Sequence, residues 1–167
     1  MEVIMISLKS ELDLESLLKE IQKLNFWLDD TGTEMAKRQS EGLFTPDAYP
    51  EIFKACNEIC NLRGIKPLHV MVNKMKPGVV VPYHRDYLKD TQKQGKYPCL
   101  ERWHLPIVMN PVCRFLYKGE LVINMKIGYW HGPIEYWRYH AVENLGVTER
   151  IHLVVDLDSE RIGNYEP

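Results

Sequence analysis

The sequence predicts a mainly β chain, folded as an antiparallel sandwich or barrel after an N-terminal helical portion. Three observations support this class. Apolar residues recur at helical spacing in the first third of the chain, whereas from Lys66 onward they alternate or cluster in short segments. Turn residues separate these short segments, and no helical pattern stands between them. Strands that follow one another without crossover helices favour antiparallel pairing.

The length of 167 residues suits one domain. We expect a single domain over residues 1–167, with a helical portion at 1–65, a strand-rich core at 66–158 and a C-terminal tail at 159–167. A hydrophobic fraction of 45% and a charged fraction of 26% are ordinary for a folded globular chain. The net charge of −2, without a concentrated basic region, speaks against direct nucleic-acid binding.

The chain shows no signal-peptide pattern at its N-terminus and no apolar run near the roughly 20 residues that cross a bilayer. We therefore expect a cytoplasmic protein without a membrane partner. The four cysteines have no C-x-x-C spacing, so we expect reduced thiols rather than a zinc or redox motif.

The N-terminal elements follow in order. The apolar run from Val3 to Leu8 indicates an edge strand. Residues 12–24 carry apolar side chains at helical spacing and predict an amphipathic helix. Residues 29–44 follow neither period and are expected to form a loop or irregular arm. A second helix is predicted over 45–62, with Gly64 placed to end it.

The strand-rich part begins near Lys66, and Lys118-Gly119 is placed at a hairpin tip. The Gly-Pro pair in Trp130-His131-Gly132-Pro133 indicates a turn, and His131 is interpreted as a simple loop residue. The predicted strands cover residues 68–73, 79–81, 102–109, 114–117, 120–126, 136–143 and 150–157.

The step His84-Arg85-Asp86 is the first candidate site. Two positions apart in an extended segment, His84 and Asp86 point to the same face. One further imidazole would complete a 2-His-1-carboxylate facial triad, the set that binds non-haem Fe(II) and leaves positions open. Such a short pattern also arises by chance at a surface turn, so the rest of the sequence has to decide.

Polar side chains on three later segments supply that context. His140 opens one predicted strand. Arg150 alternates with apolar residues in the next, and Arg102 and His104 share one face of a third. An arginine that faces a sandwich interior needs an anionic partner, because an unpaired buried charge is costly. A carboxylate held by the planar guanidinium suits this requirement.

These residues carry a family resemblance. The order is His84-Arg85-Asp86, then Arg102-Trp103-His104-Leu105-Pro106, then His140 followed ten positions later by Arg150 in E-R-I-H-L-V-V-D. It resembles the aspartyl/asparaginyl β-hydroxylase-like branch of Fe(II)/2-oxoglutarate oxygenases, and is similar to the related bacterial cis-hydroxylases of free proline. The resemblance covers about residues 68–157.

The resemblance implies a double-stranded β-helix, a cupin-like jelly roll with flanking helices. It implies Fe(II) ligation by His84, Asp86 and His140, a contact from Arg150 to the distal carboxylate of the cosubstrate 2-oxoglutarate, and further cosubstrate contacts from Arg102 and His104. Some members of this branch lack the carboxylate ligand, so the presence of Asp86 favours a complete triad. The implied reaction consumes 2-oxoglutarate and O2, releases succinate and hydroxylates an amino-acid side chain, either free or within a peptide or protein.

Two other functional classes stay open. A jelly roll with two histidines and an aspartate can hold zinc, nickel or manganese in an isomerase or hydrolase that needs no 2-oxoglutarate. The barrel can also serve as a non-catalytic binding module. Residues 87–101 form a long polar connection, interpreted either as a substrate lid or as a plain surface loop. Asn73, on the strand before His84, is a further candidate for the pocket wall.

Overall fold

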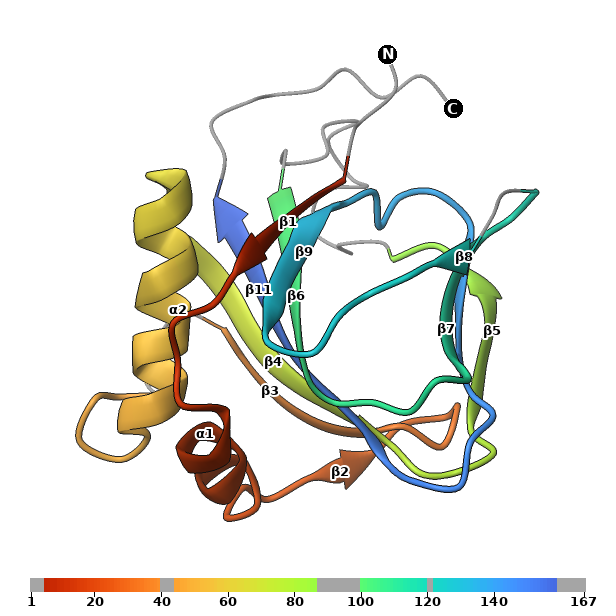
Figure 1. Cartoon of the computed structure of the whole chain (residues 1–167), viewed down its shortest axis with the longest axis horizontal. Coiled ribbons are helices and arrows are strands. Elements are labelled where there is room, and N and C mark those ends of the chain that lie inside the picture. The colour runs from red at the N-terminus through yellow and green to blue at the C-terminus, as the bar shows by residue number, and fades with distance from the viewer. Residues whose placement is uncertain (1–4, 40–43, 87–99, 120–121, 159–167) are drawn as a thin grey trace.

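The computed structural model describes residues 5–39, 44–86, 100–119 and 122–158. The chain forms a jelly roll of two antiparallel sheets, with both helices against the outer face of the larger sheet (Figure 1). The seven-stranded sheet has the order β1-β9-β6-β11-β4-β3-β2, and the four-stranded sheet the order β5-β10-β7-β8. The elements are β1 (Ile6–Lys9), α1 (Leu14–Ile21), β2 (Trp27–Leu28), β3 (Glu34–Gln39), α2 (Pro50–Arg63), β4 (Pro67–Met75), β5 (Val80–His84), β6 (Leu100–Val108), β7 (Cys113–Tyr117), β8 (Val122–Ile123), β9 (Tyr129–Ile134), β10 (His140–Asn144) and β11 (Arg150–Asp158). The predicted fold class is confirmed.

Both helices bury one face against the large sheet. The carboxylate of Asp13 caps α1 by accepting hydrogen bonds from the backbone amides of Glu15 and Ser16. Gly64, at a φ of 67°, ends α2 in the left-handed region that favours glycine. The core that they share with the sheet joins residues from α1, α2, β4, β6 and β11, among them Leu17, Ile21, Ile52, Ile59, Val72, Trp103, Leu153 and Val155.

The first turn of α2 is capped from the other helix. Tyr49, at the N-cap position, offers no side-chain hydrogen bond. Instead the buried carboxylate of Glu20 on α1 accepts from the backbone amides of Glu51 (3.1 Å) and Ile52 (2.6 Å). A negative charge here also suits the positive end of the helix dipole.

We expect Glu20→Gln to lower the free energy of unfolding by about 1–2 kcal/mol, because one carboxylate oxygen that caps α2 becomes an amide that repels a backbone N–H. Urea unfolding followed by circular dichroism measures this. Glu15→Gln is the matched control on the same helix. Its side chain is 77% exposed and pairs only with Lys19, so its loss should cost less than about 0.5 kcal/mol. Equal losses in the two variants would contradict the capping role.

The side chains of β11 alternate between the two faces of the large sheet. Ile151, Leu153, Val155 and Leu157 face the helices, whereas the alternate positions face the small sheet, as the sequence predicted. The neighbours β4 and β6 follow the same alternation, because Asn73 lies opposite His152, and Arg102 opposite Asp156. The inner face of this sheet therefore carries a group of buried polar side chains.

Two segments were wrongly predicted, and the strand predicted over 136–143 begins only at His140. Within the predicted irregular arm at 29–44, residues 34–39 form β3, which pairs with β4 and β2. The sequence Glu-Met-Ala-Lys-Arg-Gln has no strand preference of its own, so pairing with β4 dictates its conformation. The stretch 130–133, predicted as a turn, lies in β9 between β1 and β6.

His131 is accordingly a buried strand residue rather than a loop residue. It is 2% exposed, and its Nδ1 lies 2.9 Å from the Ser7 hydroxyl. Gly132 explains why a Gly-Pro pair stands inside the sheet. A Cβ at this position would lie 2.6 Å from the ring of Trp103, so only glycine lets the two strands pack at this point.

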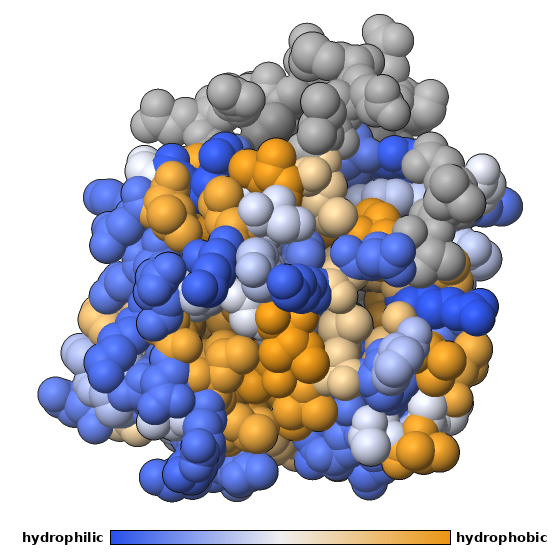
Figure 2. Space-filling model, in the orientation of Figure 1, coloured by the Kyte–Doolittle hydropathy of each residue, from blue (hydrophilic) through white to orange (hydrophobic). Residues whose placement is uncertain are grey.

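The surface matches this arrangement of layers. Hydrophilic side chains cover much of the helical side, and apolar side chains gather between the helices and the four-stranded sheet (Figure 2). Neither helix in the described part of the chain has the length and apolar character to span a membrane.

Candidate active site

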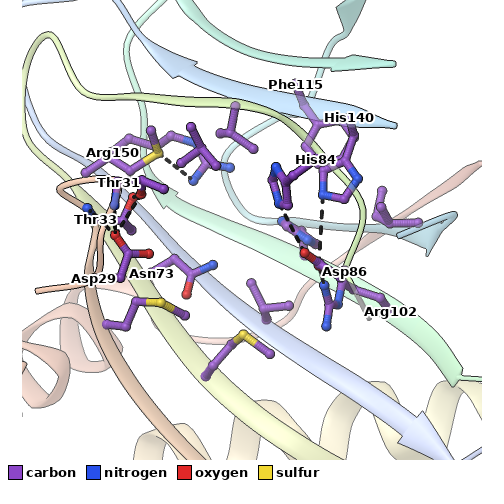
Figure 3. Close-up of a pocket in the computed structure, with 18 of the residues that line it drawn as sticks. Asp29, Thr31, Thr33, Asn73, His84, Asp86, Arg102, Phe115, His140 and Arg150 are labelled. Atoms are coloured by element: carbon purple, nitrogen blue, oxygen red, sulfur yellow. Dashed lines mark hydrogen bonds and ion pairs between the residues drawn. The ribbon is translucent and has the colours of Figure 1, made fainter. Parts of the chain in front are cut away.

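A cavity of about 480 Å³ lies between the two sheets. Its wall includes all six candidate site residues from the sequence, which are His84, Asp86, Arg102, His104, His140 and Arg150. In Figure 3, His84, Asp86 and His140 point toward one another on one side, and Arg150 lies on the other. Asn73, also proposed from the sequence, lies in the wall between them.

The two histidines and the aspartate form a compact group. One ligand atom from each residue lies within 4.8 Å of the other two. His84 Nε2 is 3.1 Å from Asp86 Oδ1, and His140 Nε2 is 3.9 Å from Asp86 Oδ2. Two imidazole nitrogens and one carboxylate that meet in this way can hold a divalent metal ion.

Strand pairing and backbone carbonyls place the two imidazoles. His140 on β10 lies opposite His84 on β5. In each ring Nδ1 is 2.8 Å from the carbonyl oxygen two residues earlier, Pro82 for His84 and Arg138 for His140. Since a carbonyl only accepts, each Nδ1 carries a proton, and in the neutral ring each Nε2 keeps its lone pair for a ligand. Phe115 stacks on His140, with ring centroids 5.3 Å apart.

The pKa values of the three side chains in this group differ from their ordinary values. Burial alone would raise the pKa of Asp86, but the hydrogen bond to His84 and the positive charge of Arg102 lower it. The pKa of His84 is raised, because Asp86 accepts a hydrogen bond from Nε2 when that ring is protonated, whereas burial lowers the pKa of His140. Asp86 is therefore ionised at neutral pH, as a metal-binding carboxylate has to be.

Arg102 lies beside this group and binds two carboxylates. Its Nε and Nη2 donate to the two oxygens of Asp156, at 2.7 and 2.9 Å, and its Nη1 donates to Oδ2 of Asp86. Burial would raise the pKa of the fully buried Asp156, yet the guanidinium charge brings it to about 2. Asp156 is thus a member of the site that the sequence interpretation did not assign.

Arg150 is a buried cation that contacts no carboxylate among the described residues. It is 3% exposed, and its guanidinium contacts His152 Nδ1 at 3.0 Å and the sulfur of Met75 at 3.6 Å. No acidic side chain in the described parts of the chain forms an ion pair with it. Burial lowers its pKa to about 10, so it stays charged at neutral pH.

His152 and His104 continue from Arg150 along the inner face of the sheet. His152 Nδ1 accepts from Arg150, and His104 Nδ1 lies 3.4 Å from the same atom. Burial, and after it the charge of Arg150, holds the pKa of both imidazoles well below the ordinary value of 6.5. Both rings are therefore neutral beside the arginine.

These two histidines predict a pH dependence of stability. The pKa of each ring is lower in the folded chain than in the unfolded chain, so below about pH 6.5 the unfolded chain binds more protons. The free energy of unfolding therefore decreases as the pH is lowered. The expected slope is up to about 1.4 kcal/mol per pH unit for each ring. Urea unfolding between pH 7.5 and 5 measures it, and His152→Gln should remove about half of the contribution of the pair. A free energy that is constant over this range would contradict the assignment.

Other cavity residues were missed by the sequence interpretation. Asp29, Thr31 and Thr33 line the wall from the turn between β2 and β3. Asp29 Oδ1 accepts from the backbone amides of Thr31 and Thr33, both at 2.9 Å, which fixes the turn. The sequence around this turn follows neither the helical nor the strand period, so it was expected to be irregular and none of its residues was assigned to the site. The expected lid at 87–101 lies, except for its last two residues in β6, outside the described residues.

The fold was compared with solved structures. An oxidoreductase of the 2OG-Fe(II) oxygenase family from Burkholderia pseudomallei has a TM-score of 0.66 at 12% identity, over 98% of this chain and 88% of that one. The viral collagen prolyl hydroxylase of Paramecium bursaria Chlorella virus-1, solved with 2OG, has a TM-score of 0.62 at 13% identity, over 92% and 94%. HygX from Streptomyces hygroscopicus, solved with nickel and 2-oxoglutarate, has a TM-score of 0.63 at 10% identity, over 93% and 83%. At these identities the likeness shows the shared fold.

Sequence comparison adds the family. No curated protein sequence matches the chain. The family model described as aspartyl/asparaginyl β-hydroxylase matches residues 34–160, a range that contains both sheets except β1 and β2. This range also contains every candidate site residue, and it confirms the family that the motifs indicated. The chain belongs to the aspartyl/asparaginyl β-hydroxylase family.

Proposed function

We propose that this protein is an Fe(II)- and 2-oxoglutarate-dependent dioxygenase that hydroxylates an amino-acid side chain. The observation that carries the proposal is the pairing of two features in one cavity. A group of two histidines and an aspartate lies on one side, and the buried cation of Arg150, without a carboxylate partner in the described residues, lies on the other. The first suits a metal ion, and the second suits a carboxylate.

The donor set fits Fe(II). His84, Asp86 and His140 offer two neutral nitrogens and one anionic oxygen, the ligand types of the facial triad. Both imidazoles are held in the tautomer that leaves Nε2 available, and Asp86 is ionised at neutral pH. Bound at these three residues, the metal would supply the oxygen activation that couples decarboxylation of 2-oxoglutarate to hydroxylation of a C–H bond.

The chain's own residues then have distinct tasks. Arg150 binds and orients the distal carboxylate of 2-oxoglutarate through its planar guanidinium. The neutral rings of His104 and His152 add hydrogen-bonding groups beside it without adding charge. The apolar walls around Phe115, Met71 and Val154 exclude water from the space between.

Arg150, which has no carboxylate partner in the described parts of the chain, also separates this proposal from the alternatives. A metal-dependent isomerase or hydrolase of the cupin type does not need a cation that binds the carboxylate of 2-oxoglutarate, and its activity would be independent of 2-oxoglutarate. A non-catalytic binding module would turn over no cosubstrate. Each alternative therefore predicts a different result in one assay.

The test supplies purified protein with Fe(II), ascorbate, O2 and 2-oxoglutarate, together with free amino acids or pools of peptides. We expect succinate release and, by mass spectrometry, the gain of one oxygen on a substrate, both dependent on 2-oxoglutarate. His84→Ala is the control and should abolish both signals. Succinate release no greater than that of the control, with every substrate pool, would contradict the proposed activity. The two kinds of pool also decide between a free amino acid and a residue within a peptide.

A further inference from the structure

Arg102 has all three of its nitrogens engaged by protein carboxylates. Nε and Nη2 form a two-pronged contact with Asp156, which is 0% exposed, and Nη1 reaches Oδ2 of Asp86. One guanidinium is therefore shared by two protein carboxylates. The contrast with Arg150, which has no carboxylate among the described residues, indicates that the two arginines have different tasks.

The same contacts fix the position of Asp86. Arg102 is anchored by Asp156 on β11 and stacks over the ring of Tyr136, with Cζ 4.9 Å from the ring centroid. The backbone carbonyl of Tyr136 in turn accepts from the amide of Asp86 at 3.0 Å. Asp86 follows the end of β5 and precedes the part of the chain outside the described residues, so these contacts hold it where the sheet no longer does.

The two oxygens of Asp86 therefore have different surroundings. Oδ2 accepts from Arg102, whereas Oδ1 lies 3.1 Å from His84 Nε2. An arginine that engages one carboxylate oxygen restricts rotation of the carboxylate and leaves the other oxygen for a metal.

We propose that Arg102, anchored by Asp156, is a positioning residue that holds Asp86 through Oδ2 and presents Oδ1 to the metal. This inference rests on the proposed function, because it takes Asp86 as a metal ligand.

The test measures Co(II) and Mn(II) affinity by calorimetry without 2-oxoglutarate, which removes the cosubstrate from the readout. Arg102→Lys keeps the charge opposite Asp156 but loses the fork, so it should weaken metal binding by about 10-fold. In the Asp86→Ala background the same substitution should have no further effect. The absorption spectrum of bound Co(II) should also change in Arg102→Lys, since the carboxylate is no longer held.

Arg63→Lys is the matched control. Arg63 on α2 forms the same two-pronged contact, with Glu101 at 2.8 and 3.0 Å, outside the cavity wall. Its replacement by lysine should leave metal affinity unchanged. Thermal unfolding of the metal-free variants establishes that each is folded. If Arg102→Lys does not fold, Asp156→Asn takes its place, because it releases the anchor and should also weaken metal binding.

The outcomes separate this inference from the proposed function. Unchanged metal affinity in Asp86→Ala would overturn both the ligand set and the inference. Weakened affinity in Asp86→Ala, with unchanged affinity in the folded Arg102 variant, would overturn the inference alone. Weaker binding of 2-oxoglutarate without any loss of metal affinity would identify Arg102 as a cosubstrate contact instead.

Discussion

Arg150→Leu is expected to weaken 2-oxoglutarate binding by about 100- to 1,000-fold, because loss of a buried, charge-assisted contact costs about 2–5 kcal/mol. The same substitution should make the ligand-free protein more stable. A buried cation without a carboxylate partner is unfavourable, and a leucine of similar volume fills the space without that cost.

The expected increase in the free energy of unfolding of Arg150→Leu follows from the lowered pKa of Arg150. Burial lowers the pKa of Arg150 well below the ordinary value of an arginine, to about 10. This corresponds to about 3 kcal/mol for keeping the group charged in the folded chain. We therefore expect Arg150→Leu to raise the free energy of unfolding by about 1–3 kcal/mol, because the lost contacts to His152 and Met75 offset part of this gain.

Chemical denaturation without ligands measures the stability, and calorimetry in the presence of Mn(II) measures 2-oxoglutarate binding. Arg150→Lys is the control, since it retains a charge and loses only the planar fork. It should bind 2-oxoglutarate weakly without the gain in stability. A less stable Arg150→Leu protein, or one that binds 2-oxoglutarate as the wild type does, would contradict this account of Arg150.

Asp156→Ala should have the largest effect on stability, a loss of about 3–5 kcal/mol in the free energy of unfolding. The substitution leaves the buried guanidinium of Arg102 without the two hydrogen bonds that it makes to Asp156, at 2.7 and 2.9 Å. It also removes the anion within 3.6 Å of His69 Nδ1. Urea unfolding monitored by tryptophan fluorescence measures the loss.

The stability of the folded chain at acidic pH provides an independent test of the contribution of Asp156. Its pKa is 3.8 in the unfolded chain and about 2 in the folded chain, so its contribution is complete above pH 3.8 and is lost as the pH falls toward 2. Asp158→Ala, at the exposed end of the same strand, is the control and should change stability by less than about 0.5 kcal/mol. A similar loss in both variants would mean that the contact with Arg102 does not stabilise the fold.

The sequence was informative where strand periodicity and motif coincide. In 150–157 the alternation of apolar and polar residues separated Arg150 from the apolar face, and in the structure Arg150 lines the cavity between the sheets. The fold class and the family were predicted on the same basis and are confirmed. The roles of the individual site residues stay predictions until the variants are measured.

The partner of Arg102 could not be predicted in this way. Asp156 lies 54 residues further along the chain, and the two meet because β6 and β11 pair in one particular register. Register depends on the packing of whole strands, so a single sequence does not reveal which carboxylate will stand opposite an arginine. Strand β3 was missed for a related reason, since its neighbour β4 rather than its own composition makes it a strand.

The hydrogen bonds that orient the two imidazoles have an evolutionary consequence. Each Nδ1 proton is held by a main-chain carbonyl two positions earlier, at residues 82 and 138. A main-chain acceptor persists whatever side chain the residue carries, provided that the local backbone path is kept. Proline and arginine occupy these positions here, and mutational drift could exchange either one without disturbing the tautomer of the histidine that follows. The orientation of both rings is in this sense encoded by chain geometry, and it leaves the neighbouring side chains free to diverge with substrate.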